Sequence, residues 1–218
     1  MNKLWLSCLC ALPSFVSASD LVDVSPVTDR ILLVHFDDGK VQYHGKGQKT
    51  GDAIVTVDPL DVKAAQSLGS YRLIGSGAFA GGLAPNQIWR KSKGTEFAWY
   101  VDSWNGRAVN TRPDHAKEHW IYLYLPSPLV QGSTYSLSTG ALAKNGNTFK
   151  FTFDAGKTRS ETVHVNTVGY VPSAPQKFGY LYQWMGDGGG LDVSPLIGRK
   201  FQVLESGTGN SVLQGKVA

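Results

Sequence analysis

Cysteine is nearly absent from this chain. Its two cysteines, Cys8 and Cys10, both lie close to the N-terminus. If the N-terminal segment that carries both cysteines, the leader, is cleaved off, the mature chain has no disulfide and no thiol chemistry. The rest of the chain must then be stabilised by its hydrophobic core alone, which requires more than a minimal domain size.

Charged residues are also few, and they form no long run of either sign. They make up 17% of the sequence, and the formal net charge is +4, or +3 once Lys3 is removed with the leader. The basic residues are scattered singly, whereas nucleic-acid-binding proteins cluster them to neutralise successive phosphates. We therefore expect no nucleic-acid partner, despite a pI of about 9.0.

No apolar run is long enough to cross a bilayer, which takes about 20 residues. The mostly apolar stretch Leu4–Val16 follows Lys3 and ends at the small residues Val16-Ser17-Ala18. This order is typical of a secretory signal peptide. We expect residues 1–18 to be cleaved and the protein to be exported, to the periplasm or the extracellular space.

Two alternatives for this leader fit less well. A buried N-terminal helix is opposed by Asp20 and Pro26, which end the apolar pattern at once. A lipid anchor at Cys8 would leave only a short apolar stretch before it.

Glycine and aromatic residues are plentiful, with 25 glycines, six tryptophans and nine tyrosines. Together with apolar–polar alternation, this composition is typical of a turn-rich, all-β exported protein. Strands are predicted at Ile31–Phe36, Lys40–His44, Ala53–Val57, Tyr71–Ile74, Glu96–Val101, Trp120–Leu125, Thr134–Leu137, Thr148–Phe153, Thr162–Val165, Phe178–Tyr182, Phe201–Leu204 and Val212–Gly215.

Glycine and asparagine predict two hairpin-type turns, Asp37-Asp38-Gly39 and Asn145-Gly146-Asn147, because both residue types accept positive φ. One short helix is predicted within Pro59–Leu68.

The predicted fold is two consecutive antiparallel β-sandwiches. A polar stretch at Asp154–Ser160 separates residues 20–158 from residues 159–218. An immunoglobulin-like sandwich takes about seven strands and about 100 residues. The second module is therefore expected to lack its final strands, and residues 20–158 are expected to fold alone better than the whole chain.

The second module carries the motif Asn166-Thr-Val-Gly169-Tyr170-Val-Pro172. This stretch resembles the start of the immunoglobulin-like domain at the N-terminus of family 9 glycoside hydrolases, the cellulases and endoglucanases. Phe201–Leu204 and Val212–Lys216 resemble the next strands of that domain. Thr167 departs from the glutamine usual in the family, and the glycine-rich loop Trp184–Gly190 is longer.

The resemblance implies an accessory role. In such enzymes the domain packs against an (α/α)6 barrel that carries the catalytic carboxylates, and this chain has no room for that barrel. None of the matching positions is catalytic in the family, so Asn166, Gly169, Tyr170 and Pro172 are expected to be structural. The implied partners are a downstream catalytic domain of the same polypeptide and a polysaccharide.

The spacing His115-x-x-Glu118-His119 matches that of inverted zinc peptidases. Zinc binding would need these residues on a helix, yet a strong strand begins at Trp120. We therefore predict that the segment is a polar turn before a strand.

Other chemical motifs have simpler interpretations. Paired carboxylates mark glycosidases, but Asp37 and Asp38 suit a turn. Asp187 and Asp192 are candidate calcium ligands, although the spacing lacks the density of an EF-hand loop. No serine lies in a nucleophile elbow, and no glycine-rich loop carries a P-loop lysine. No catalytic residue, metal or cofactor is assigned.

Exposed tryptophans stack on the apolar faces of sugar rings because they offer a flat, rigid surface. Trp99 is predicted to face the core, since it alternates with Phe97 and Val101. Trp104, in a predicted turn, and Trp184, in the glycine loop, are the candidate glycan contacts, with a core or domain-interface position as the alternative.

The sequence thus predicts a non-catalytic N-terminal portion of an exported family 9-type glycoside hydrolase. Two rivals stay open, a free-standing carbohydrate-binding protein and a structural or adhesive cell-surface protein.

Overall fold

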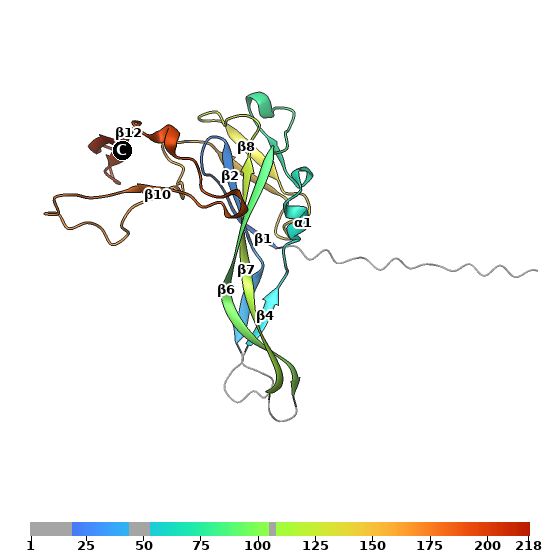
Figure 1. Ribbon diagram of the computed structural model, residues 1–218. Coiled ribbons are helices and arrows are strands. Elements are labelled where there is room, and N and C mark those ends of the chain that lie inside the picture. The colour runs from blue at the N-terminus through green and yellow to red at the C-terminus, as the bar shows by residue number, and fades with distance from the viewer. Residues whose placement is uncertain (1–18, 44–52, 105–107) are drawn as a thin grey trace, which may run out of the picture.

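The computed structural model describes residues 19–43, 53–104 and 108–218, and of residues 53–56, 99–104 and 108–112 it describes the backbone only. The predicted signal peptide lies outside these residues. The fold is all-β, with antiparallel ladders (Figure 1). In chain order its strands are β1 (Asp20–Pro26), β2 (Ile31–Asp37), β3 (Gly39–Tyr43), β4 (Ala53–Val57), β5 (Arg72–Ile74), β6 (Gln87–Trp104), β7 (Ala108–Tyr124), β8 (Thr134–Ser138), β9 (Thr148–Thr152), β10 (Val163–His164), β11 (Tyr180–Leu181), β12 (Lys200–Leu204) and β13 (Ser211–Lys216).

The helices are short. They are α1 (Val62–Ala65) and the 3-10 turns η1 (Leu68–Ser70), η2 (Gly77–Phe79), η3 (Gly186–Gly188) and η4 (Ser194–Leu196). Asp61 begins α1 by accepting a hydrogen bond from the Ala64 amide. Among the described residues, no helix combines the length and apolarity needed to cross a membrane.

Two sheets form a sandwich. The first has the order β1-β2-β7-β6 and the second β5-β8-β9. Alternation along β2 and β7 turns Leu32, Val34, Ile121 and Leu123 inward, where each is fully buried. Tyr135 and other apolar side chains of the second sheet pack against them. This core is the hydrophobic centre of the chain.

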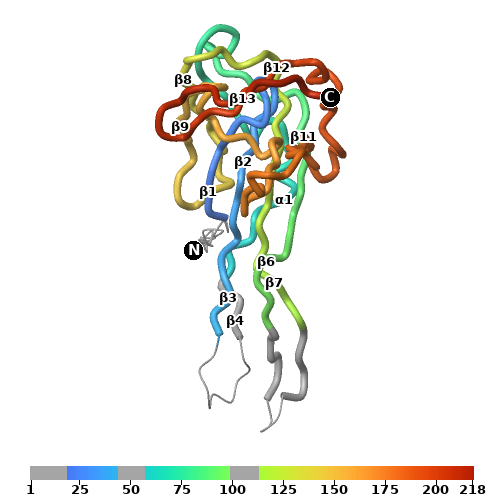
Figure 2. The backbone as a smooth tube through the Cα atoms, turned by 90° about the vertical axis from the view of Figure 1, so that its left-hand side faces the viewer, coloured from blue at the N-terminus to red at the C-terminus, as the bar shows by residue number. Residues whose placement is uncertain are grey.

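The strands β6 and β7 continue past the sandwich as a long hairpin arm (Figure 2). Strands β3 and β4 pair with each other beside this arm, where Val41 packs with Ala98 and Ala116 in a small second cluster. Glu96 accepts a hydrogen bond from the Val41 amide at 2.6 Å. The arm is therefore held by contacts of its own.

Two local predictions were wrong. Asp37-Asp38-Gly39 is not a hairpin turn, because β3 pairs with β4 and the chain passes from one sheet to another at Asp38. His115–His119 is not a turn either, but lies within β7 in register with β6. Cross-strand pairing along the arm makes this polar segment extended despite its composition.

The C-terminal part consists of small hairpins that project to one side of the sandwich (Figure 1). Strand β10 pairs with β11, and β12 pairs with β13. Every residue of β12 is exposed, and so is every residue of β13 except the half-buried Gly215. This part of the chain has no buried core like that of the sandwich.

Candidate functional site

The outer face of the first sheet carries a charged aromatic group around Trp120. The Trp120 ring stacks on the His35 ring, with centroids 4.8 Å apart and an interplanar angle of 11°. From the neighbouring strand β6, the Nζ atoms of Lys91 and Lys93 lie 5.0 and 5.6 Å from the centre of the same ring. Two ammonium groups are thus gathered on one indole by cation–π attraction.

No carboxylate among the described residues neutralises these two lysines. Glu118 is the direct cross-strand partner of Lys93. Its carboxylate is turned away, however, and lies 2.6 Å from His35 Nε2. The lysines therefore present positive charge to solvent.

A shallow open pocket of about 350 Å³ begins at Lys91. Its other walls come from the chain that leads to β10 and from the chain that follows β11. The lining includes Arg159, Glu161, His164, Tyr182 and Trp184. The pocket thus combines cations, one carboxylate, an imidazole and two exposed aromatic side chains, which is a set that suits a polar ring-shaped ligand.

The Trp184 side chain is 60% exposed, and the structure records no ring contact for it. By contrast, Tyr182 stacks on His164 with centroids 3.8 Å apart. The backbone of Trp184 is fixed to strand β7, because its carbonyl accepts a hydrogen bond from the Tyr122 hydroxyl at 3.4 Å. The Trp184 ring is therefore an available flat surface on a fixed backbone.

The glycine-rich loop after Trp184 is attached to the edge strand β6. Met185 is buried in the outer-face cluster with Tyr122 and Leu33. Asp187 accepts a hydrogen bond from the Arg90 amide at 2.6 Å and another from Gln66 Nε2 at 2.9 Å. These contacts position the loop and the pocket wall above it.

Two glycines of this loop are required by close packing. A Cβ at Gly186 would lie 2.0 Å from the Arg90 carbonyl oxygen, and Gly186 has φ +69°. A Cβ at Gly188 would lie 2.4 Å from the Trp89 ring. The glycine content that marks this loop in the sequence therefore reflects its contact with β6.

The two tryptophans predicted to contact glycan differ in position. Trp184 lines the pocket. Trp104 is the last residue of β6 and pairs with Ala108. The rest of its predicted turn, and its side chain, lie outside the described residues. Glycan contact by either residue stays a prediction.

Among the described residues, the candidate calcium ligands Asp187 and Asp192 have different partners and make no contact with each other. Asp187 is engaged with β6, while Asp192 accepts a hydrogen bond from the Ser194 amide at 2.9 Å. Within the described residues, no group of three His, Cys, Asp or Glu side chains is placed to hold a metal ion. The calcium site stays a prediction.

The residues of the zinc-peptidase spacing are divided between the two faces of β7. His119 points inward and is 3% exposed, while Glu118 points outward to His35. The two histidines would be the zinc ligands. On a helix they would lie one turn apart on the same face, whereas in β7 the strand rise of about 3.3 Å per residue separates their backbones by about 13 Å. The expectation that the spacing is not a zinc site stays a prediction.

His119 instead belongs to a hydrogen-bonded array that runs from buried Asp38 to exposed Ser92. Its Nε2 lies 3.0 Å from Asp38 Oδ2, and its Nδ1 lies 2.7 Å from Ser92 Oγ. Ser92 Oγ also accepts a hydrogen bond from Arg90 at 2.5 Å. A neutral imidazole with its proton on Nε2 satisfies all of these contacts.

The order Ser–His–Asp resembles that of a nucleophilic triad, but the backbone context differs. Ser92 lies in a regular stretch of β6, directly paired with His119. Hydrolases place the nucleophile at a sharp turn, where backbone N–H groups form an oxyanion hole. We therefore infer that the array has a structural role. It forms the polar end of the core, where β2, β6 and β7 leave the sandwich.

The family motif forms a compact turn. Gly169 has φ +98°, which requires glycine. The Tyr170 hydroxyl donates to the Phe178 carbonyl and accepts from the Asn166 amide. Lys177 Nζ donates to the Pro172 carbonyl at 3.1 Å. The Tyr170 hydroxyl is thus hydrogen-bonded on both sides, while the residue is 37% exposed.

Sequence reasoning missed the lysines of the site. The alternation Trp89-x-Lys91-x-Lys93 places all three side chains on one face of a strand, and this pattern was the available signal. The register that brings Lys91 opposite Trp120 could not be inferred from it, because β6 lies outside the predicted strands at this point.

Comparisons with known proteins add no relative. No protein-family model matches the chain, and neither a curated protein nor a solved structure matches it.

Proposed function

We propose that this chain is a non-catalytic accessory portion of an exported polysaccharide-degrading protein of the family 9 glycoside hydrolase type. In this proposal its C-terminal part packs against a further domain of the same polypeptide. The proposal rests on the motif resemblance and on one structural observation, the uncovered apolar face of the hairpin β12–β13.

That hairpin is amphipathic. Val203 pairs with Leu213, and Phe201 pairs with Gly215, so their side chains share one face. Lys200, Gln202, Gln214 and Lys216 occupy the other face. Clean alternation of this kind is typical of a sheet with one face buried and the other in water.

The apolar face is nevertheless exposed, with Phe201, Val203 and Leu213 at 42%, 44% and 58%. Further exposed apolar side chains lie in the same C-terminal part, among them Val163, Val165, Phe178, Tyr180 and Ile197. A two-stranded hairpin is marginally stable on its own in water. Large uncovered apolar surfaces mark interaction sites, which supports a packing partner for this part.

Hydrogen exchange on a longer gene product tests this proposal. We would express the chain together with the coding sequence that follows Ala218 in its gene, and compare amide exchange in β12 and β13 with that of the present chain. The proposal predicts much slower exchange in the longer product. Equal exchange in both products, or a gene that encodes nothing after Ala218, would contradict it.

The free-standing carbohydrate-binding protein stays as a second candidate because of the pocket at Trp184. It predicts that the purified chain alone binds a polysaccharide and that Trp184→Ala weakens binding. A chain that binds none of a broad polysaccharide panel would exclude this candidate and leave the first one in place.

A further inference from the structure

We propose that the pocket beside Trp184 binds an anionic sugar, one that carries carboxylate or sulfate groups. This inference rests on the glycan-binding part of the proposed function and specifies its ligand. The observation that carries it is the gathering of unneutralised cations in and beside a pocket with exposed aromatic side chains.

Three cations lie at the site. Lys91 is shared between the Trp120 group and the pocket lining, and Arg159 also lines the pocket. Lys93 stands next to Lys91 over the same indole. None of the three makes an ion pair with another described residue, so their mutual repulsion is unrelieved in the free protein.

The nearby carboxylates do not cancel this charge. Glu118 is directed to His35 at 2.6 Å. Glu161 lies in the pocket wall, and its nearest recorded partner is Gln183 Nε2 at 3.5 Å. One carboxylate among three cations leaves an excess of positive charge, and Glu161 has the acceptor oxygens that sugar hydroxyls require.

Trp120 is not itself the stacking surface, because His35 lies against its ring and the two lysines lie over it. Its role is to hold the ammonium groups in place. Trp184, which lines the same pocket as Lys91, provides the exposed ring. A sugar stacked on Trp184 can thus direct an anionic substituent toward Lys91 and Arg159.

The experiment compares matched polysaccharides on the whole chain. Affinity electrophoresis is run with polygalacturonate and alginate as uronates, with carrageenan as a sulfated galactan, and with hydroxyethyl cellulose and galactomannan as neutral controls. The expected result is retardation by at least one anionic polysaccharide, weakened at high salt because the contact is charged.

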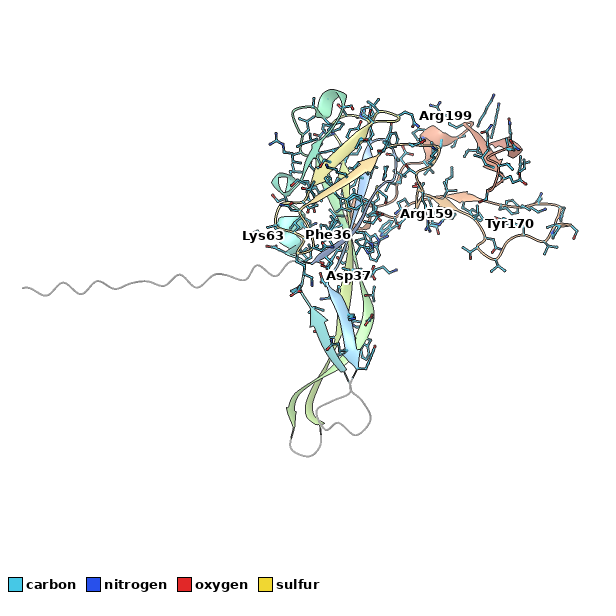
Figure 3. The ribbon with its side chains drawn as sticks, turned by 180° about the vertical axis from the view of Figure 1, so that it is seen from behind. Phe36, Asp37, Lys63, Arg159, Tyr170 and Arg199 are labelled. Atoms are coloured by element: carbon cyan, nitrogen blue, oxygen red, sulfur yellow. The ribbon has the colours of Figure 1, made fainter. Side chains whose placement is uncertain are left out.

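Variants identify the site. Lys91→Gln and Lys93→Gln together are expected to weaken binding about tenfold or more, as is Trp184→Ala. Lys63→Gln is the control for the loss of a surface ammonium group, since it removes one positive charge at exposed Lys63 of α1, across the molecule from Arg159 (Figure 3). Thermal melts of each variant verify that the fold is kept.

The comparisons between polysaccharides and between variants distinguish the possible results. Preference for a uronate over a sulfated chain, or the reverse, identifies the anionic group. Binding to neutral polysaccharides that needs Trp184 but not the lysines would overturn the inference and keep the glycan-binding function. Binding to DNA or polyphosphate as strong as to anionic glycans would also overturn it. Binding to nothing in the panel would reject both.

Discussion

His119 Nε2 lies 3.0 Å from Asp38 Oδ2, and the two side chains are 3% and 5% exposed. They come from the strand β7 and from the passage between β2 and β3. The Leu60 amide donates to the other Asp38 oxygen at 2.8 Å. One carboxylate therefore joins three separate segments of the chain at the polar end of the core.

This pair predicts a dependence of stability on pH. Burial alone would raise the pKa of Asp38, but the hydrogen bonds from His119 and the Leu60 amide hold the pKa below its ordinary value. A depressed folded-state pKa means that the stabilisation is complete above the unfolded pKa of about 3.9 and is lost as pH falls through the folded pKa. Urea unfolding between pH 2.5 and 7, followed by tryptophan fluorescence, is expected to show this loss.

The variant Asp38→Asn removes the titrating group and is expected to flatten this part of the acid profile. His119→Ala leaves a buried carboxylate without its partner, so it should lower the free energy of unfolding by about 3 kcal/mol at neutral pH. A loss below about 0.5 kcal/mol would show that the contact does not stabilise the fold.

The glycine loop gives a second prediction with a matched control. Gly186→Ala is expected to detach the loop, because the new Cβ would lie 2.0 Å from the Arg90 carbonyl at φ +69°. Gly190→Ala is the control, since nothing lies within 4 Å of its Cβ position. We expect Gly186→Ala to lower the melting temperature and to weaken any glycan binding at Trp184, and Gly190→Ala to do neither. Equal behaviour of the two variants would contradict the packing argument.

Two leucine substitutions test whether the sandwich contributes more to the free energy of unfolding than the C-terminal hairpins do. Leu123 is fully buried, so Leu123→Ala should cost about 2–5 kcal/mol of unfolding free energy. Leu213 is 58% exposed, so Leu213→Ala should change it by less than about 0.5 kcal/mol. In a longer product whose extra residues cover β12–β13, Leu213→Ala is expected to become costly. An unchanged cost there would argue against that cover.

Limited proteolysis checks the division of the chain. Residues 20–158 contain the core shared by the two main sheets, whereas the strands β12 and β13 are exposed along their length. We expect a protease to digest 159–218 first and to leave a protected N-terminal fragment that refolds on its own. Simultaneous loss of both parts would contradict the predicted boundary.

Much of the sheet structure was predictable because apolar alternation reports burial directly. Ala53–Val57 is observed with the predicted bounds, and Trp120–Tyr124 lies in β7 as expected. The arm was predictable only in part. Glu96–Val101 alternates and was predicted as a strand, whereas the polar segment His115–His119 is extended because of β6–β7 pairing. Strand β1 was missed, since its sequence has few apolar residues and its place at the sheet edge depends on β2.

The candidate site, like the fold, could be predicted from the sequence only in part. Trp184 was singled out because a tryptophan in a glycine loop was expected to be exposed, and it is. Lys91 and Lys93 gain significance only from the strand register, which pairs Lys91 with Trp120. Asp38 and His119 are far apart in sequence, and no local pattern indicates that they meet.

The hydrogen bond from the Arg90 amide to Asp187 has a consequence for solubility. Strand β6 is the outer strand of its sheet, and an outer strand offers unpaired N–H groups to which another molecule can add a strand. Asp187 occupies one of these donors at 2.6 Å, and the glycine loop covers the backbone around it. The loop that presents Trp184 thereby also protects this edge of the sheet from intermolecular strand addition and aggregation.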